Sequence, residues 1–450
     1  MARRRCPAYG HSRCRTAVSI SPGGKGLAIV KGDNVKILRG PRRLAQVAGC
    51  AALALGLASS AAATSGVAHA AVAVPARTCC IFPSHPAAVS WGANQYGQLG
   101  NGTYAEYAVY GDVDGLTGVT QVAAGWDHGL ALTSDGTVWA WGAGNAGQLG
   151  NGGTTGSPVP EQVPGLTGVI QIAAGAAFSL ALTSDGSVWA WGEDDQGQLG
   201  NDSTTNSEWP VQIAGLTGVT QIGAGTEFGM ALRSDGTVWT WGLNSSGQLG
   251  NATTTSSDVP VQVSGLSQVT QIAAGGDFAM AARTQGFVTM LTSVWTWGSN
   301  QFGALGDGDT EPYRSTPGQV SGISVPSVRQ IAAGAEYSMV LGSDGSVWAW
   351  GADYDGQLGN AATYALQAQP VETIGMASGI THIAAGVNHV LALRSDGTVL
   401  AWGNDQTSEI GNGTTSDVPA LPTEVSGLTN ATGVSAGGDF SLAVHTVYGI

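Results

Sequence analysis

A Trp-Gly step recurs seven times along the chain at a nearly constant spacing. The tryptophans are separated by 50, 50, 50, 56, 53 and 52 residues, and they are Trp91, Trp141, Trp191, Trp241, Trp297, Trp350 and Trp402. A period near 50 residues is typical of propeller blades and solenoid units, which bury their apolar faces only against neighbouring copies. This repeat, rather than the length of 450 residues, therefore decides the predicted domain organisation.

One repeat, residues 171–211, predicts four strands. Apolar residues alternate in FSLAL (178–182) and VWAW (188–191), and the segment Ser184-Asp185-Gly186 between them favours a hairpin turn. The preceding QIAAG has small side chains suited to the crowded centre of a ring, and the later proline-containing segment suits an outer edge strand. Four strands per repeat predict a propeller blade.

The first and last copies of the repeat are each incomplete. AVSWG has no hairpin partner before it, and VSAGGDFSLAVHT has no Trp strand after it. Pairing of residues 88–92 with residues 439–446 would join the two fragments into one blade. The prediction is an all-β, seven-bladed β-propeller of four-stranded blades over residues 87–448, closed by its N- and C-terminal strands so that no sheet edge stays open.

The N-terminal region has the composition of a targeting segment. Arg39, Arg42 and Arg43 precede an apolar, small-residue run that ends in VAHA at residues 67–70. This pattern predicts a signal peptide over residues 39–70 with cleavage after Ala70, and hence a secreted protein without a transmembrane anchor in its mature form. A membrane-spanning helix is the alternative interpretation of the run. Residues 1–38 would be an extension that a start codon placed too early explains, and residues 71–86 a linker.

Charge narrows the class of partner. From residue 81 onward the chain has 30 acidic side chains against 5 basic ones. Nucleic-acid binding depends on Lys and Arg that replace counterions on phosphate, so this composition predicts no nucleic-acid partner and favours a basic one.

Acidic side chains follow the inner-strand glycine in most copies. Five of them are predicted to surround the upper mouth of the channel: Asp127, Glu227, Asp277, Glu336 and Asp439. A solvated rim is one interpretation, and a site for a basic partner or a cation such as Ca²⁺ is the other. No calcium loop of recognised spacing occurs, so neither a metal nor a cofactor is predicted.

Two of the 14 tryptophans lie outside the repeated strand positions. Trp126 and Trp209 are predicted in top loops of neighbouring blades, and exposed tryptophan is common among binding hot spots. Each could instead pack on its own loop. With acidic neighbours in the same loops they outline a candidate binding patch, which comprises Trp126, Trp209, Glu193, Asp194, Asp195 and Glu208.

One hairpin is six residues longer than its equivalents. Residues 284–295 read TQGFVTMLTSVW where other copies have S-D-G. The insertion predicts a protruding lower-face hairpin around Phe287, either a binding wedge or a self-packed extension. No nucleophile elbow, phosphate loop or Cys/His metal spacing appears, and no enzymatic activity is predicted.

The recurring AAG step, S-D-G turn, V-W-x-W-G strand and G-Q-L-G-N loop resemble the regulator of chromosome condensation repeat family over about residues 87–448. The resemblance implies a seven-bladed β-propeller. The nuclear founder of the family exchanges nucleotide on a small GTPase and docks on chromatin through a wedge and a basic surface. A similar propeller, secreted by soil bacteria, inhibits β-lactamases through a face crowded with Tyr and Trp.

These observations predict a secreted, monomeric, non-catalytic binding scaffold that recognises a protein or a cell-surface polymer through its top-face loops. Three alternatives stay open: a secreted enzyme inhibitor, a guanine-nucleotide exchange factor, and a hydrolase or lyase that works at the channel mouth. Fold alone does not choose among them.

Overall fold

The computed structural model describes residues 85–285, 291–309, 311–362, 366–376 and 379–447, and three short strands nearer the N-terminus. The chain divides into two compact units, Met1–Thr78 and Cys79–Ile450. In the first unit, β1 (Ala17–Ser19), β2 (Ala28–Lys31) and β3 (Asn34–Lys36) form an antiparallel sheet. The predicted signal peptide, residues 39–70, lies outside the described residues, and so do residues 71–84 of the predicted linker.

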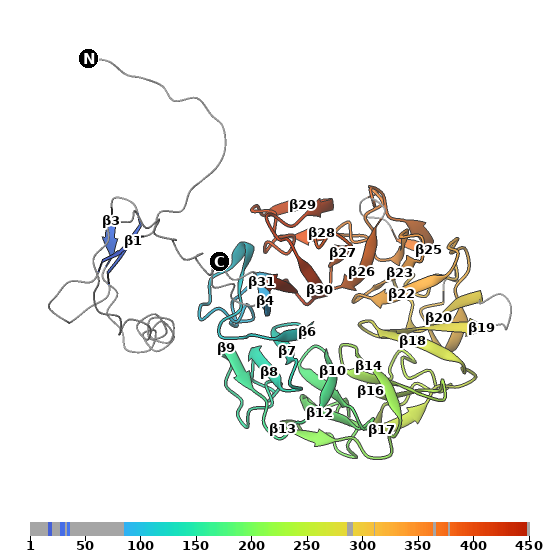
Figure 1. The fold of residues 1–450 in the computed structure, drawn as a ribbon. Helices are drawn as coiled ribbons and strands as arrows, with labels where there is room; N and C mark the ends of the chain where they lie inside the picture. Colours follow the sequence, from blue (N-terminus) through green and yellow to red (C-terminus); the bar gives the residue numbers. More distant parts are fainter. Residues whose placement is uncertain are drawn as a thin grey trace, which may run out of the picture. The chain divides into compact units, whose positions relative to one another are not determined.

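In the second unit, seven four-stranded antiparallel sheets surround a central axis, and the described residues contain strands but no helix (Figure 1). The innermost strands are β6 (Val119–Ala124), β10 (Val169–Ala174), β14 (Val219–Ala224), β18 (Val269–Ala274), β22 (Val328–Ala333), β26 (Ile380–Ala385) and β30 (Ala431–Ala436). The second strands are β7 (His128–Thr133), β11 (Phe178–Thr183), β15 (Phe228–Arg233), β19 (Phe278–Gln285), β23 (Tyr337–Gly342), β27 (His389–Arg394) and β31 (Phe440–Val447). The third strands, which hold the Trp-Gly steps, are β8 (Val138–Gly142), β12 (Val188–Gly192), β16 (Val238–Gly242), β20 (Leu291–Ser299), β24 (Val347–Gly351), β28 (Val399–Asp405) and β4 (His85–Gly92). The outer strands are β9 (Ser157–Gln162), β13 (Ser207–Gln212), β17 (Ser257–Gln262), β21 (Tyr313–Gln319), β25 (Gln367–Glu372), β29 (Ser416–Glu424) and β5 (Tyr107–Asp112). The predicted seven-bladed β-propeller is confirmed.

The two ends of the propeller share one blade. Strand β4 pairs antiparallel with β31 in a register that runs from Gly92 opposite Phe440 to His85 opposite Val447. The blade order is β30, β31, β4 and β5, so the predicted closure by N- and C-terminal strands is confirmed. Closure removes the unpaired edge that an open ring of blades would present to other chains.

Adjacent inner strands are joined by the glutamine of the QIAAG segment. Gln171 Nε2 donates to the carbonyl oxygen of Ile222 in the next blade at 3.1 Å, and its Oε1 accepts from the Ile222 N–H at 3.0 Å. Gln221 makes the same pair of bonds with Ile272. The amide therefore satisfies backbone groups that no strand pairing reaches, because neighbouring inner strands belong to different sheets.

The Trp-Gly tryptophans join the blades farther out. Each of their side chains is fully buried, and each Nε1 donates to a backbone carbonyl of the preceding blade at 2.8–3.0 Å. The second glycine of the G-Q-L-G loop makes room for this contact. At Gly200, with a φ of +64°, an added Cβ would lie 2.7 Å from Cδ1 of Trp241. The two halves of the repeated motif are thus the two sides of one interface between blades.

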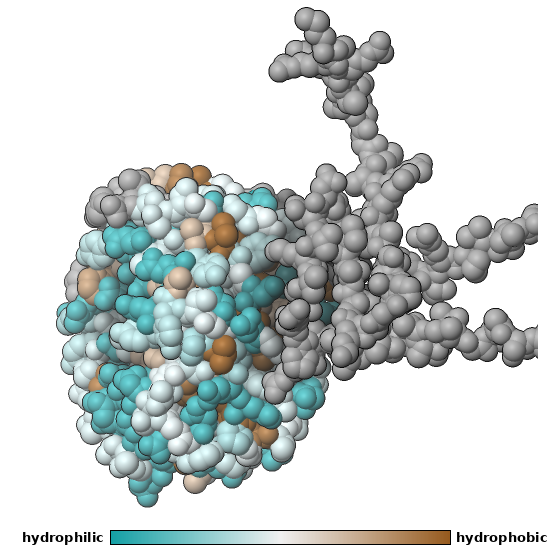
Figure 2. Space-filling view, turned by 90° about the vertical axis from the view of Figure 1, so that its left-hand side faces the viewer, coloured by the Kyte–Doolittle hydropathy of each residue, from teal (hydrophilic) through white to brown (hydrophobic). Residues whose placement is uncertain are grey.

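The S-D-G segments form tight turns at the opposite end of the blades from the glycines of the inner strands. Asp185 Oδ1 accepts from Thr183 Oγ1 at 2.6 Å and from the Ser187 N–H at 3.1 Å, while Gly186 has a φ of +82°. The predicted turn chemistry is confirmed. The flank seen in Figure 2 is mostly hydrophilic or of intermediate hydropathy, and hydrophobic residues appear there as separate spots.

Candidate binding site at the mouth of the channel

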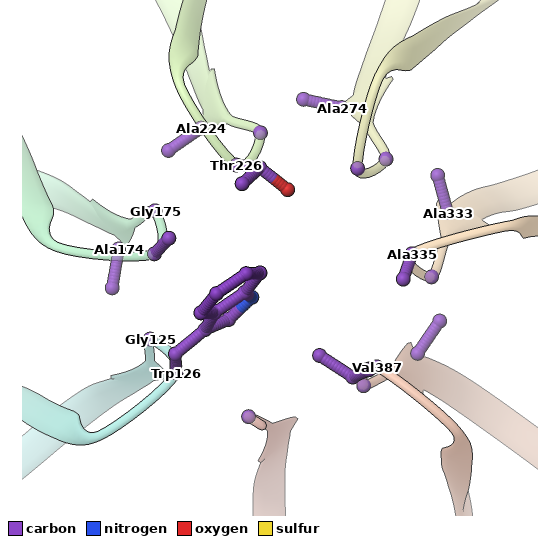
Figure 3. A pocket seen from close by; sticks show the side chains of 18 of the residues that line it. Gly125, Trp126, Ala174, Gly175, Ala224, Thr226, Ala274, Ala333, Ala335 and Val387 are labelled. Carbon is purple, nitrogen blue, oxygen red and sulfur yellow. The ribbon is translucent and has the colours of Figure 1, made fainter. Parts of the chain in front are cut away.

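Seven short turns surround one end of the axial channel, which we call the top face. Each turn follows an inner strand, and the residue after the strand's glycine lines a cavity of about 100 Å³ in six of the seven blades (Figure 3). These six residues are Trp126, Ala176, Thr226, Gly276, Ala335 and Val387.

The turns are bonded to one another through their backbones. The N–H of Ala176 donates to the carbonyl oxygen of Thr226 at 3.2 Å, and the Thr226 N–H donates to Gly276 at 3.1 Å. Across the closing blade, the Gly438 N–H donates to Gly125 at 3.0 Å. The mouth of the channel is therefore a preorganised surface and not a set of independent loops.

Trp126 is the only large side chain among the six residues that line the mouth. Its side chain is 47% exposed, and Figure 3 shows the indole pointing from the β6–β7 turn toward the centre of the ring, with small residues such as Ala335 and Val387 around it. The sequence placed Trp126 in a top loop, and the structure has it in a turn of that face. An exposed indole on a rigid base is an effective contact surface for a partner.

Carboxylates surround the residues that line the channel. The five turn acids were predicted at the mouth itself, but in four of these blades the residue before the acid lines the cavity, at Trp126, Thr226, Gly276 and Ala335, and in the blade of Asp439 the lining ends at Gly437. The carbonyl oxygen of each acid accepts an N–H from the loop that follows Trp-Gly in the same blade, as Asp127 does from Ala143 at 2.8 Å and Glu227 from Leu243 at 2.9 Å. We define the acidic ring as Asp127, Glu193, Asp195, Glu227, Asp277, Glu336 and Asp439.

Members of the acidic ring lie close enough to disfavour one another's ionisation. Burial, and then the charge of Asp439, raises the pKa of Asp127 above its usual range. Burial raises the pKa of Glu227, and the charges of Asp195, Glu193 and Asp277 raise it further. Burial and Asp195 likewise raise the pKa of Glu193, which stands in the blade whose turn has Ala177 in place of an acid. The ring is thus a set of like charges that a cationic group would stabilise.

The aspartates of the S-D-G turns have the opposite electrostatics. Hydrogen bonds from Thr133 and Thr137 lower the pKa of Asp135, and hydrogen bonds from Thr237 lower that of Asp235. Their charge is satisfied by the turn itself, so they are structural carboxylates.

Asp194 is not part of the binding surface, which corrects its place in the predicted patch. Its side chain is fully buried, and its Oδ1 accepts the Leu199 N–H at 2.9 Å. Asn244 makes the same bond to Leu249 in another blade. The residue therefore shapes the loop from inside, whereas its neighbours Glu193 and Asp195 belong to the acidic ring.

Glu208 and Trp209 lie in outer strand β13, so the prediction that they fall in a loop was wrong. The strand begins at Ser207, three residues before Pro210, because Ser207 pairs with Gly192 of β12. The Ser207 hydroxyl also donates to the carbonyl oxygen of Trp209 at 2.7 Å. Trp209 is 51% exposed, and a Cβ on Gly152 of the preceding blade would collide with its ring. Trp126 points to the axis and Trp209 stands on the periphery, so the two do not form one patch.

Phe287 lies outside the described residues. The hairpin that leads to it is longer than its equivalents, since β19 and β20 stay paired as far as Gln285 opposite Leu291. The predicted lengthening of this hairpin is confirmed for the described residues, and the choice between a binding wedge and a self-packed extension, with the role of Phe287, stays a prediction.

Three exposed or partly exposed aromatic residues near the acidic ring were missed at the sequence level. Tyr96, Phe302 and Tyr354 occupy the variable positions just before the glycine of the G-Q-L-G loop. Gln98 Nε2 donates to Asp127 Oδ1 at 3.3 Å, which ties the loop of Tyr96 to the ring. Phe302 and Tyr354 pack edge to face across adjacent blades, with centroids 6.0 Å apart. The two positions before this glycine vary from copy to copy while the rest of the loop is nearly constant, and this variation could have indicated a surface that contacts a partner.

Two further properties bear on the site. In the part of the chain that the structure describes, no group of three or more His, Cys, Asp or Glu side chains is arranged to hold a metal ion. The described residues also contain no helix long and apolar enough to cross a membrane.

The fold and the site define a closed seven-bladed β-propeller that presents a rigid, acidic and aromatic top face. Residues 52–281 match the RCC1-like domain, and residues 293–341, 344–393 and 396–444 match the regulator of chromosome condensation (RCC1) repeat. The chain belongs to the RCC1-like family.

Known proteins resemble this chain in sequence over part of its length or in structure over most of it. Human E3 ubiquitin-protein ligase HERC2 is 36% identical over 157 residues, which cover 34% of this chain and 3% of HERC2. The chain therefore spans only a small part of that relative. Prp20p from Saccharomyces cerevisiae superposes with a TM-score of 0.72 at 25% identity, over 82% of this chain and 93% of Prp20p. Human WBSCR16 superposes with a TM-score of 0.71 at 22% identity, over 81% and 99% of the two chains, and shows the fold alone.

Proposed function

We propose that this protein is a secreted, non-catalytic binding scaffold that recognises a basic segment of a partner protein through its top face. The observation that carries the proposal is the position of Trp126, whose exposed indole points toward the centre of the channel mouth in a turn whose next residue is Asp127 of the acidic ring.

The chemistry of the ring favours a cationic partner. Ring carboxylates have pKa values raised by burial and by one another, as at Asp127 and Glu227, so a Lys or Arg side chain would relieve repulsion that the free protein retains. A cation over the face of an exposed indole gains about 0.5–1 kcal/mol, and more when desolvated. An acidic face also speeds encounter with basic proteins at low ionic strength.

One relative supports a protein partner of this kind. Yeast Prp20p binds Gsp1p and histones, and histones are basic proteins. Export rests on the N-terminal pattern of Arg39, Arg42 and Arg43, an apolar run and VAHA. Mass spectrometry of the native protein tests it, with a mature N-terminus near Ala71 in the secreted fraction as the expected result.

Binding is tested by titrating the mature propeller with a fluorescently labelled Lys- and Arg-rich peptide and following anisotropy. We expect Trp126→Ala and the double variant Glu227→Gln/Asp277→Asn each to weaken binding at least about fivefold, the equivalent of about 1 kcal/mol. Binding of the unmodified propeller should weaken as salt is raised.

Two variants are matched controls. Trp209→Ala removes an equally exposed indole from the periphery, and Asp185→Asn removes a carboxylate from an S-D-G turn. Both should bind as the unmodified protein does. If Trp209→Ala weakens binding as much as Trp126→Ala, the channel mouth is not the site.

Guanine-nucleotide exchange is a second candidate, and one observation favours it. Strands β19 and β20 stay paired as far as Gln285 opposite Leu291, beyond the ends of the equivalent hairpins. A small GTPase loaded with fluorescent GDP is the probe. Acceleration of GDP release by the unmodified protein, and its loss on Phe287→Ala, would establish exchange in place of the scaffold.

A further inference from the structure

An asparagine closes the top-face loop after Trp-Gly in three of the blades. Asn94 Oδ1 accepts the Leu99 N–H at 3.0 Å, and its Nδ2 donates to the carbonyl oxygens of Thr103 at 3.0 Å and Ala105 at 2.9 Å. Asn244 and Asn300 make the same three bonds with the residues 5, 9 and 11 positions further on. One amide thus ties both ends of the loop together, because it accepts on one side and donates on the other.

An aspartate occupies this position in three other blades, at Asp194, Asp353 and Asp405. Each Oδ1 accepts the same N–H, from Leu199 at 2.9 Å, Leu358 at 3.1 Å and Ile410 at 3.3 Å. Among the described residues, none of the three buried Oδ2 atoms has a hydrogen-bond partner of ordinary geometry. Weaker bonds from the Asn360 side chain and the Thr205 backbone act on the carboxyl groups of Asp353 and Asp194 and favour their charged forms. Since Oδ1 stands where the asparagine Oδ1 does, Oδ2 takes the place of the donating Nδ2.

An ionised aspartate cannot make the asparagine's bonds. At the asparagine position the second side-chain atom faces backbone carbonyl oxygens, which only accept. In the Asp194 loop, the Oδ1 of Asn201 is a further buried acceptor that finds no partner in the described part of the chain. Oxygens facing oxygens in a buried site repel unless a proton or a cation lies between them.

The spacing favours a proton over a metal ion. The Asn94 Nδ2 lies 2.9–3.0 Å from the two carbonyl oxygens, a distance that suits an O–H···O bond of about 2.5–3.0 Å. A calcium ion bound at about 2.3–2.6 Å from every oxygen would push these oxygens farther apart.

We propose that Asp194, Asp353 and Asp405 are held as neutral acids whose Oδ2–H donates to the loop carbonyls, and that they act as proton-dependent latches of three top-face loops. The loops are fastened at acid pH and loosen as the protons leave. The inference concerns loop stability and does not depend on the proposed binding function.

The electrostatics of the sites agree with the latch. Burial, the largest cause, raises the pKa of Asp194 to about 7 and that of Asp353 to about 6. Burial also raises the pKa of Asp405. The charged groups that act on Asp194 are Asp195 in its own loop and Asp258 in β17, both of which disfavour its ionisation. At Asp353 and Asp405 the opposing influences are hydrogen bonds, and no charged side chain of the described residues is among the causes.

The sign of the pH dependence follows from these directions. An unfolded aspartate has a pKa of about 3.9, so the folded protein holds protons that the unfolded chain has released. The latches contribute their full stability below about pH 4, and this stability is lost as pH rises through about 6 to 7.

The test is thermal unfolding of the mature protein and of the triple variant Asp194→Asn/Asp353→Asn/Asp405→Asn at pH 5 and pH 8. Asparagine already occupies this position at residues 94, 244 and 300, so the variant is compatible with the fold. We expect the Tm of the variant at pH 8 to exceed that of the unmodified protein by at least about 2–4 °C. The difference between Tm at pH 5 and Tm at pH 8 should be smaller in the variant. The reverse change, Asn244→Asp, should add a pH dependence to a loop that lacks it.

Two results would overturn the proposal. One is a triple variant whose Tm difference between pH 5 and pH 8 equals that of the unmodified protein. The other is a rise in Tm at pH 8 on adding CaCl₂ or NaCl that the triple variant lacks, which would assign a cation to the gap. Infrared absorption of protonated carboxyl groups at pH 5.5, lost in the variant, is the independent measurement that keeps the inference testable if the melts are irreversible.

Discussion

The Nε1 of Trp91 donates a hydrogen bond to the carbonyl oxygen of Glu409 at 2.8 Å, across 318 positions of the sequence. Trp91 belongs to the first Trp-Gly step and Glu409 to the last copy of the G-Q-L-G loop. The other six Trp-Gly tryptophans bond to the preceding blade in the same way. The contact that joins consecutive blades therefore also closes the ring.

Removal of this closing bond should destabilise the propeller. Trp91→Phe removes the Nε1 donor from a fully buried site. The Glu409 carbonyl then keeps the bond from Ser441 Oγ and loses the one from the indole. We expect a loss of about 1–3 kcal/mol in the free energy of unfolding, measured by denaturant titration. Trp126→Phe, at an exposed position, should change it by no more than about 0.5 kcal/mol. Equal effects of the two variants would contradict this role of the bond.

Glu409 should make the closing seam sensitive to pH. It stands where five other loops have glutamine, and burial, the first cause, raises its pKa to about 7. The folded protein keeps this proton where the unfolded chain has lost it, so stability falls as pH rises from about 4.5 through 7. Glu409→Gln removes the buried charge but also the acceptor for Asn404 Nδ2, while its remaining oxygen can keep the bond from the Thr407 N–H. The variant should therefore be more stable relative to the unmodified protein at pH 8 than at pH 4. A gain of the same size at both pH values would refute the assignment, and Gln198→Glu is the matched reverse variant.

Gly225 should not tolerate a side chain. An added Cβ would lie 2.6 Å from the carbonyl oxygen of Gly275 in the next blade and would overlap the ring of Phe228. Gly225→Ala should therefore lower stability by about 1–3 kcal/mol or more, because the inner strands would have to separate. Calorimetric Tm is the measurement. Ala177→Gly, in a turn of the same face, serves as the control and should lower Tm by less than Gly225→Ala does.

The S-D-G aspartates should stabilise the protein in the opposite pH range. Asp235 Oδ1 accepts from the N–H and Oγ1 of Thr237, and these bonds lower its pKa. A lowered folded pKa gives stability above the unfolded value of about 3.9, which is lost as pH falls through the folded pKa. Asp235→Ala should lower Tm at pH 7, and the deficit should shrink toward pH 2. A deficit independent of pH would mean that the turn needs only the shape of the side chain.

Most of the fold was predictable because its signals are local and repeated. The alternation in FSLAL and VWAW predicts strands, the S-D-G segment predicts a turn, and the small residues of QIAAG predict the crowded innermost strand. Each pattern is ambiguous in one copy, but its recurrence in seven copies removes the ambiguity. The two incomplete copies even predicted the pairing of β4 with β31. The start of an outer strand such as β13 was less predictable, because its first residues pair through a bulge that leaves no pattern.

The site was only partly predictable. Trp126 and the acids Asp127, Glu227 and Asp277 could be assigned to the top face from chain direction. Whether a side chain there points into the channel, lies in the ring or is buried inside a loop depends on contacts between blades that no repeat shows. Asp194 and Asp195 are adjacent in sequence, yet one is buried and the other is exposed.

The sequence by itself determined the number of blades, the strand order within each blade and the way the ring closes, because these follow from local periodicity and from which copies are incomplete. Only the tertiary structure decided which polar side chains have partners. Asp194 and Asn244 stand at the same position of their loops, yet the Nδ2 of Asn244 donates to two loop carbonyls and the Oδ2 of Asp194 has no hydrogen-bond partner among the described residues. Burial and hydrogen bonding are properties of the assembled ring, and so the chemistry of the top face appears only there.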